Sequence, residues 1–420
     1  MEPLLYLTHR IPFPPNKGDK LRSYHLLKHL ASKYRVFLGT FVDHDADWHH
    51  VEAVRELCED TWFGRIHPRL APLRGLTGLF TGEPVSLAHF RDARLGAWVD
   101  AVIERERIEK TVVFSSPMAQ YVLPHRHLRR VVDFVDVDSD KWRQYAAARR
   151  WPVSWVFGRE ARALLEFERS VARQVDASFF VTAREAALFA RLAPDCKDRI
   201  YACANGVDGD WFSPDAVLSS PYPAGVRPLV FTGAMDYWPN IDAVCWFARE
   251  ALPKIRAQAP AVRFYIVGMN PPPAVRALQK DPAVEVTGRV DDVRPYVRHA
   301  AVAVAPLRVA RGIQNKVLEA MAMAKPVVVS ASSAAALSAR PGVEIEVAET
   351  AEGFAAKTLS LLAPARADEI GRAARRRVLA DYDWSANLKR FDEALGSDEP
   401  TTGGPHQDAP AARVRKIASV

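Results

Sequence analysis

A short segment in the last third of the chain concentrates cationic and small polar residues that would suit an anion. Between two apolar runs, nine residues hold three cations, a glycine and two amides, namely Arg308, Arg311, Gly312, Gln314, Asn315 and Lys316. The residues that follow have the composition of a short helix. The start of a helix offers free N–H groups and a positive dipole end, so cations there conflict with the dipole unless an anion binds. The pattern favours a diphosphate site, although solvated surface charges would give the same spacing.

Glu319 is the one acidic residue in this predicted helix, about one turn after its start. Glu319 lies three residues after Lys316, at a spacing that pairs side chains on one helix face. Its apolar neighbours indicate burial, and a buried carboxylate needs partners. Two interpretations stay open, a carboxylate paired with Lys316 and a carboxylate that accepts hydrogen bonds from the hydroxyls of a ribose.

Strand-like and helix-like segments alternate on both sides of an irregular stretch. Predicted strands in the first half are 4–8, 36–41, 111–114, 130–134, 177–181 and 200–203, and predicted helical segments are 20–32, 51–59, 93–107, 142–172 and 183–192. A second series starts with the strand 229–232. Because such alternation builds βαβ units, we expect an α/β fold with two doubly wound Rossmann-like domains that face each other across a cleft. Ligands would bind at the carboxyl ends of the strands.

The irregular stretch marks a domain boundary. It combines Asn205-Gly206-Val207-Asp208 with a proline-rich segment at 213–228. The predicted organisation is an N-terminal domain at 1–205, a linker at 206–227, a C-terminal domain at 228–380, a closing helix at 381–395 and a disordered tail at 396–420.

The turn after the first strand carries Lys17, Gly18, Asp19 and Lys20. Asp19 is a natural N-cap for the helix that follows, and Gly18 permits close approach of the backbone to a ligand. An ordinary strand–helix turn and a site for a substrate phosphate both fit these residues. The sequence GxxxxGK[ST] is absent, so the turn is not a P-loop.

Four closely spaced aspartates lie at and after the predicted strand 130–134, namely Asp133, Asp136, Asp138 and Asp140. A metal site is one interpretation, but aspartates at a strand end commonly bond loop amides. We therefore predict no metal site and expect Asp136 to line the cleft and contact substrate hydroxyls.

Residues 61–82 contain no acid and combine basic with apolar side chains. Such a surface can bind anionic lipid headgroups, and a loop packed on the N-terminal domain is the simpler interpretation.

Composition excludes several function classes. The net charge of +7 is spread over the chain and does not indicate a nucleic-acid-binding protein. The four cysteines have no metal-binding spacing, which favours a reducing, cytoplasmic setting. No run of 18 apolar residues is present. We expect a cytoplasmic protein that can associate with the inner face of a membrane.

Five stretches together resemble a retaining glycosyltransferase of the GT-B fold, family-4-like, and more narrowly the sugar transferases associated with exosortase/PEP-CTERM exopolysaccharide systems. They are residues 9–31, 131–142, 205–214, 229–244 and 311–330. The resemblance implies a nucleotide-diphosphate sugar donor on the C-terminal domain, a glycan or lipid-linked acceptor on the N-terminal domain, and no metal or other cofactor. Gly233, Arg308, Arg311, Gly312, Asn315, Lys316 and Glu319 would bind the donor, and Lys17, Gly18 and Asp136 the acceptor. Glu319, Lys316, Arg308 and Asp136 would serve catalysis.

The chain departs from the family pattern in two places. The first of two glutamates that the family often carries around the cationic segment is Arg311 here. The loop 233–240 lacks the usual Arg and Lys, and we interpret Trp238 as core and Asn240 as the N-cap of the next helix. A nucleotide-sugar epimerase of the same fold and a nucleotide-sugar-binding protein without activity remain alternatives to the transferase.

Overall fold

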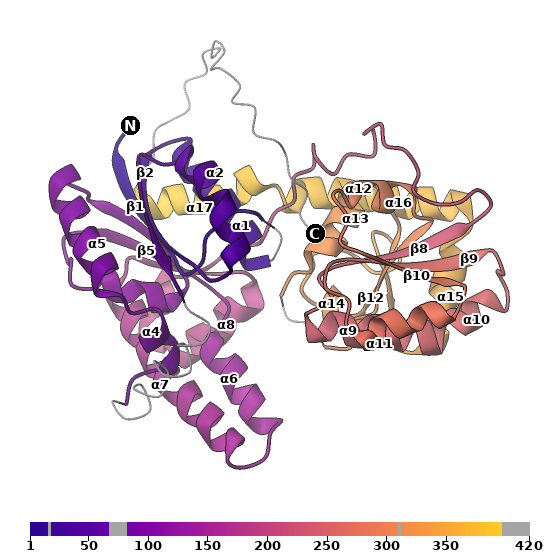
Figure 1. Cartoon of the computed structure of the whole chain (residues 1–420), viewed down its shortest axis with the longest axis horizontal. Coiled ribbons are helices and arrows are strands. Elements are labelled where there is room, and N and C mark those ends of the chain that lie inside the picture. Colours follow the sequence, from indigo (N-terminus) through magenta and orange to yellow (C-terminus); the bar gives the residue numbers. More distant parts are fainter. Residues whose placement is uncertain (16–17, 67–81, 310–311, 397–420) are drawn as a thin grey trace, which may run out of the picture. The chain divides into compact units, whose positions relative to one another are not determined.

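A computed structural model describes residues 1–15, 18–66, 82–309 and 312–396, and these form two compact units (Figure 1). The first unit comprises Met1–Pro15, Asp19–Cys203 and the described chain from Leu388 onward. The second comprises Ala204–Asn387. Two parallel-sheet α/β units confirm the predicted fold class.

The first unit is built on a seven-stranded sheet of order β3-β2-β1-β4-β5-β6-β7 in which neighbouring strands pair in parallel. Its strands are β1 (Pro3–Thr8), β2 (Arg35–Val42), β3 (Asp60–Arg65), β4 (Lys110–Phe114), β5 (Arg129–Val135), β6 (Ala177–Phe180) and β7 (Ile200–Ala202). Its α-helices are α1 (Gly18–Ala31), α2 (Val51–Arg55), α4 (Val85–His89), α5 (Ala93–Glu106), α6 (Asp138–Ala147), α7 (Val153–Gln174) and α8 (Ala183–Leu192), with 3₁₀ turns η1 (Asp45–His50), η2 (Ser116–Tyr121) and η3 (Pro194–Arg199). Central strands such as β1 are buried along almost their whole length, as expected where helices cover both faces of a parallel sheet.

The second unit has a six-stranded parallel sheet of order β10-β9-β8-β11-β12-β13. Its strands are β8 (Arg227–Thr232), β9 (Val262–Val267), β10 (Val284–Gly288), β11 (Val302–Ala305), β12 (Val327–Ser330) and β13 (Glu346–Ala348). Its helices are α9 (Trp238–Trp246), η4 (Phe247–Ala251), α10 (Leu252–Arg256), α11 (Pro273–Arg276), η5 (Ala277–Lys280), α12 (Arg294–His299), α13 (Asn315–Ala322), α14 (Ala331–Ala334), α15 (Ala351–Leu361) and α16 (Pro364–Asp381). The last helix, α17 (Trp384–Leu395), begins in this unit. Residues 206–227, expected to form a linker, belong to this unit and contribute Val207 and Phe212 to its core.

Most predicted elements are present, and α8 has the predicted bounds. The strand β3 was not predicted, because its sequence, DTWFGR, shows no alternation and reads as an irregular basic segment. It forms an edge strand that pairs only with β2, so much of it is only partly buried.

A buried ion pair joins three elements of the first unit. The Arg22 guanidinium of α1 donates to both carboxylate oxygens of Asp133 in β5, at 2.7 and 3.2 Å, and also to the carbonyl oxygen of Cys203 at 2.9 Å. Both side chains are fully buried. An unpaired charge in this position would have no solvent to compensate it.

The substitution Arg22→Leu is therefore expected to destabilise the first unit by about 3–5 kcal/mol, because Asp133 keeps a buried charge without its partner. Hydrogen exchange should accelerate at the amides of β1 and β5 while those of β8 and β9 keep their protection. The control is Arg22→Leu combined with Asp133→Val, which removes both charges and should recover most of the lost protection. Unchanged exchange in the single variant would contradict the assignment.

Candidate functional site

The predicted cationic segment lies at the point where the strand order of the second sheet reverses. β8 pairs with β9 on one side and with β11 on the other, and the chain leaves both β8 and β11 at the same sheet edge. The loop after β8 contains Gly233, and the loop after β11 leads through Arg308 to α13. Ligands of doubly wound folds bind at such a switch point.

The ammonium group of Lys316 is held at the centre of this edge. Its Nζ donates to the side-chain oxygen of Asn240 at 2.8 Å and lies 4.6 Å from the ring centroid of Phe231. Asn240 donates in turn from its Nδ2 to the carbonyl oxygen of Ala234 at 2.8 Å, which fixes the orientation of the amide. A lysine tethered in this way is presented in one position.

Gly233 makes room for that ammonium. The backbone of Gly233 has φ 149°, and a Cβ atom there would lie 3.2 Å from the Nζ of Lys316 and 2.9 Å from the Nδ2 of Asn240. Gly268 packs behind it so closely that a Cβ would fall 1.8 Å from the carbonyl oxygen of Gly233. Because neither glycine carries a side chain, the loop after β8 packs directly against the nitrogen atoms of Lys316 and Asn240.

Lys316 and Glu319 shift each other's ionisation within the same face of α13. Burial lowers the pKa of the Lys316 ammonium to about 8, and the charge of Glu319 opposes that shift. Burial raises the pKa of the Glu319 carboxyl to about 7, and Lys316 opposes that shift. The Glu319 side chain is buried, and its carboxylate has no hydrogen bond or ion pair with any described residue. Both groups are thus under-solvated and suited to a polar ligand.

The start of α13 lacks a side-chain cap. Its N-cap, Gln314, makes no capping bond from its side chain, and its first turn contains no acid. Asn315 begins the helix, and its side-chain oxygen lies 3.4 Å from the Nδ2 of Asn205. Gly312 has φ 62°, a left-handed conformation that glycine adopts without strain. Arg311, the third predicted cation, lies outside the described residues.

Arg308 is less available than predicted. Its guanidinium contacts both carboxylate oxygens of Asp242 in α9, with Nε at 2.9 Å from Oδ2. More than half of its side chain is exposed. Asn240 and Asp242 therefore tie Lys316 and Arg308 to the same helix, although an anion would compete with Asp242 for Arg308.

The structure corrects two predictions for the loop after β8. Asn240 is not an N-cap, because α9 already begins at Trp238 and the amide of Asn240 is used by Ala234 and Lys316. Trp238 is not a core residue, since it is 59% exposed. No pattern in the sequence indicates the Asn240–Lys316 contact, because it joins residues 76 positions apart.

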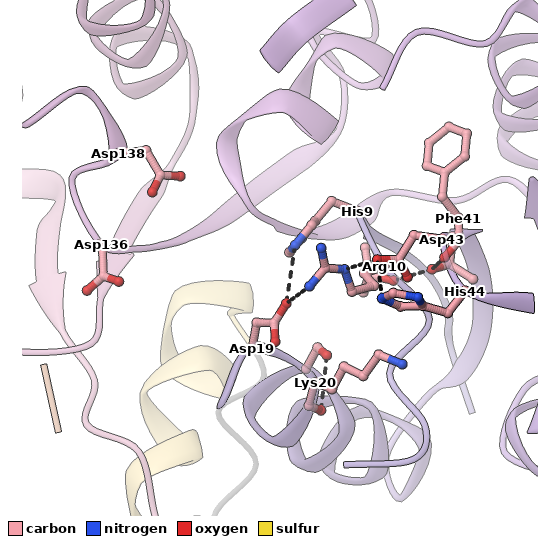
Figure 2. A network of polar contacts seen from close by, with 12 residues as sticks. His9, Arg10, Asp19, Lys20, Phe41, Asp43, His44, Asp136 and Asp138 are labelled. Atoms are coloured by element: carbon pink, nitrogen blue, oxygen red, sulfur yellow. Dashed lines mark hydrogen bonds and ion pairs between the residues drawn. The ribbon is translucent and has the colours of Figure 1, made fainter. Parts of the chain in front are cut away.

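At the edge of the first sheet, five side chains form a network that was not predicted (Figure 2). Arg10, directly after β1, donates from Nη1 to Asp19 at 2.8 Å and from Nε to Asp43 at 2.8 Å. His9 Nε2 lies 3.7 Å from the same Asp19 oxygen. His44 Nε2 lies 3.8 Å from Asp43. With neutral histidines, one cation faces two carboxylates, so the network carries a formal charge of −1 and suits hydroxyl groups better than phosphate.

His9 is held rigidly in this network. Its ring stacks on Phe114 with centroids 5.7 Å apart and meets the edge of Phe90 at 5.6 Å. Its Nδ1 is buried and has no hydrogen-bond partner in the described structure, and the same holds for Oδ1 of Asp43. Partial burial opposes ionisation of Asp19, but His9 and Arg10 hold the pKa of that carboxyl well below its usual range. A fixed imidazole beside an ionised carboxylate can accept a proton from a hydroxyl.

The turn after β1 differs from its prediction. Asp19 is not an N-cap, because α1 begins at Gly18 and the Asp19 side chain pairs with Arg10 instead. Lys20 is buried and bound to Asp47 at 2.6 Å. That ion pair leaves Lys20 no free charge for a substrate phosphate. Gly18 is exposed, and Lys17 lies outside the described residues.

The aspartates at the end of β5 and the start of α6 form ion pairs within the first unit. Asp136 and Asp138 each lie 2.9 Å from the Nζ of Lys141. Figure 2 draws both aspartates outside the dashed network of His9 and Arg10. Behind them, burial and the charge of Asp138 raise the pKa of the Glu168 carboxyl to about 8. Asp136 is partly exposed at the carboxyl end of β5, which is compatible with its predicted contact to substrate hydroxyls.

Of the predicted lipid-binding segment 61–82, residues 61–65 lie in β3 and 67–81 lie outside the described residues. None of the described helices is long and apolar enough to cross a membrane.

Part of the second unit matches a known sequence-family model. Residues 227–364 match the family model described as glycosyl transferases group 1, a segment that includes Gly233, Lys316 and Glu319. No curated protein sequence matches the chain.

Solved structures share the fold over almost the whole chain at low sequence identity. Sucrose-phosphate synthase from Thermosynechococcus elongatus is 16% identical, with a TM-score of 0.66 over 94% of this chain and 99% of that one. HepE from Anabaena, solved in complex with UDP, is 14% identical, with a TM-score of 0.65 over 94% and 100%. A glycosyltransferase from Rickettsia africae is 13% identical, with a TM-score of 0.66 over 94% and 100%. The fold is that of GT-B glycosyltransferases, and the family match supports a glycosyltransferase of this type.

The buried pair in α13 predicts a pH dependence of stability. Glu319 has a raised pKa in the folded state, so the folded chain keeps a proton that the unfolded chain releases, and stability falls as the pH rises from about 4.5 to about 7. Glu319→Gln removes this titration. Its melting temperature should therefore rise relative to wild type across that window, by the equivalent of about 1–3 kcal/mol.

Lys316→Met provides the complementary test. The lowered pKa of Lys316 makes wild-type stability increase between about pH 8 and 10.5, and the methionine variant should lose that increase. A constant difference between wild type and either variant over its window would show that the pair is not buried as described.

Proposed function

We propose that this chain is a retaining glycosyltransferase that transfers a sugar from a nucleotide-diphosphate donor to a lipid-linked glycan acceptor in exopolysaccharide synthesis. The observation that carries the proposal is the tethered Lys316 ammonium, which packs against Gly233 at the switch point of the second sheet. The group 1 family match covers this site, and the UDP complex of HepE favours a nucleoside diphosphate as its ligand.

On the donor side, each described group has a distinct task. The diphosphate would bind Lys316 and the N–H groups at the start of α13, where the charge and the helix dipole add. Glu319 would accept hydrogen bonds from ribose hydroxyls. Because negative charge grows on the diphosphate as the sugar leaves, groups fixed in advance at that position stabilise the transition state. No described step requires a metal, and Arg308 and Arg311 would contribute further positive charge.

On the acceptor side, the first sheet edge would bind hydroxyl groups. Asp136 and the network of His9, Arg10, Asp19 and Asp43 supply acceptors and donors that are already oriented. Lys17 and Gly18 are proposed to complete this site.

Inversion at the anomeric carbon is the alternative stereochemical outcome, and the His9–Asp19 pair favours it. The pair of His9 and Asp19 has the composition of a general base with its orienting carboxylate, and the 3.7 Å separation can tighten when a substrate binds. A base that deprotonates the acceptor would allow direct displacement with inversion at the anomeric carbon. Retention, in which the leaving phosphate assists the attack, does not need this base.

Donor binding can be tested with the purified chain and uridine, guanosine and adenosine diphosphate sugars. One of them should raise the melting temperature, because a ligand of the native state stabilises it. Lys316→Met should abolish the rise and lower kcat/KM by about 10²–10³-fold.

Lys325→Met is the matched control for this experiment. Lys325 also has a pKa lowered by burial to about 8, but it follows the far end of α13. This variant should retain the donor-induced shift. Epimerised donor without any acceptor would favour the epimerase, and binding without turnover would favour a protein without activity.

The anomeric configuration of the product, determined by NMR, tests the stereochemistry, and retention is expected. His9→Gln should then raise the acceptor KM by about 10-fold, because it only positions a hydroxyl, and leave the donor-induced shift unchanged. His44→Gln, at an exposed neighbour in the network, is the control. An inverted product together with a loss of kcat of about 10²-fold or more in His9→Gln would replace retention by the base mechanism.

A further inference from the structure

The closed end of the hairpin formed by α6 and α7 exposes aromatic side chains that the first unit does not bury. Trp151, in the connection between the two helices, is 80% exposed, and Trp155 and Tyr145 are 58% and 54% exposed. Val153 is a further exposed apolar residue there. Figure 1 shows this end extending beyond the other described elements of the first unit. A cluster of exposed aromatic residues is a common sign of an interaction surface.

The exposed residues stand on a packed support. The ring of Trp142 in α6 lies 5.2 Å from that of Phe157 in α7, and Tyr145 lies 6.4 Å from the same phenylalanine. These contacts hold the two helices together just below the closed end. The aromatic cluster is thus presented by a braced hairpin.

The same end of the hairpin carries only positive charge. Residues 143–156 include Arg143, Arg149 and Arg150 and no acid. Arg143 is paired with Asp140 at 2.6 Å. Arg149 and Arg150 are exposed and form no ion pair with the described part of the chain. Aromatic side chains beside unpaired arginines match the chemistry of the interface between lipid headgroups and acyl chains.

We propose that this hairpin end attaches the first unit to a membrane surface that contains anionic phospholipid. Trp151, Trp155 and Tyr145 would enter the headgroup region, and Arg149 and Arg150 would bind the lipid phosphates. A second copy of the chain is the less suitable occupant, because a two-fold contact would place the same arginines against each other. The residues of this attachment surface are not those of the segment 61–82.

The position of the hairpin links this surface to the acceptor edge. α6 begins at Asp138, immediately after the carboxyl end of β5, and its ten residues span about 15 Å. If the proposed transfer to a lipid-linked acceptor is correct, the hairpin would keep Asp136 within reach of a glycan carried at the membrane surface. The attachment itself does not depend on that function.

Co-sedimentation of the full chain with vesicles tests the proposal. Wild type should bind vesicles of equal parts phosphatidylcholine and phosphatidylglycerol, more weakly at high salt, with a blue shift of tryptophan emission. Arg149→Gln with Arg150→Gln should weaken binding about 30-fold. Trp151→Ser with Trp155→Ser should weaken it about 10-fold or more and remove the blue shift.

The control is Arg372→Gln with Arg376→Gln, which removes the same charge from exposed positions of α16 and should leave binding unchanged. Circular dichroism and the donor-induced thermal shift should be preserved in every variant, which separates failure of this proposal from failure of the proposed function. The proposal would be overturned if wild type stayed in the supernatant, or if the control variant lost as much vesicle binding as the arginine variant. It would also be overturned if sedimentation velocity showed a wild-type dimer that the tryptophan substitutions dissociate.

Discussion

The partly buried ammonium of Lys316 is the constraint on which the candidate donor site depends. A charge in that position loses solvation, and the structure compensates with an amide oxygen, an aromatic face and a nearby carboxyl. That compensation is incomplete, since the pKa of the lysine is still lowered. A diphosphate would supply the missing negative charge, so the same feature that strains the unliganded site would favour its ligand.

The two sheet edges differ in charge in a way that matches two kinds of ligand. The edge of the second unit presents Lys316 at a helix start that contains no acid. The edge of the first unit presents Arg10 between Asp19 and Asp43, and two further described cations, Lys20 and Arg22, are held in buried ion pairs. An anion is therefore favoured at one edge and neutral hydroxyls at the other. Such a division is what a reaction between a nucleotide sugar and a glycan requires.

The sequence predicted what depends on local pattern. Strands buried on both faces and helices with one apolar stripe gave the α/β class, and the spacing of Lys316 and Glu319 correctly placed them on one helix that follows β11. The edge strand β3 was missed because it is partly exposed and lacks alternation. Asn240 was misassigned because its position suited a cap, whereas the backbone had already entered the helix at Trp238.

The network around His9 was beyond prediction for a different reason. His9 and Asp43 follow different strands, and only the order β2-β1-β4 brings their loops and the ring of Phe114 to one place. A single sequence contains the residues but not that order. The same applies to Arg308. Its place in the cationic segment was evident from the sequence, but its ion-pair partner, Asp242, comes from the helix after β8. Strand order therefore decides which cation is available to a ligand. Arg308 is paired with a carboxylate and Lys316 with a neutral amide, so Lys316 is the stronger candidate for binding an anion.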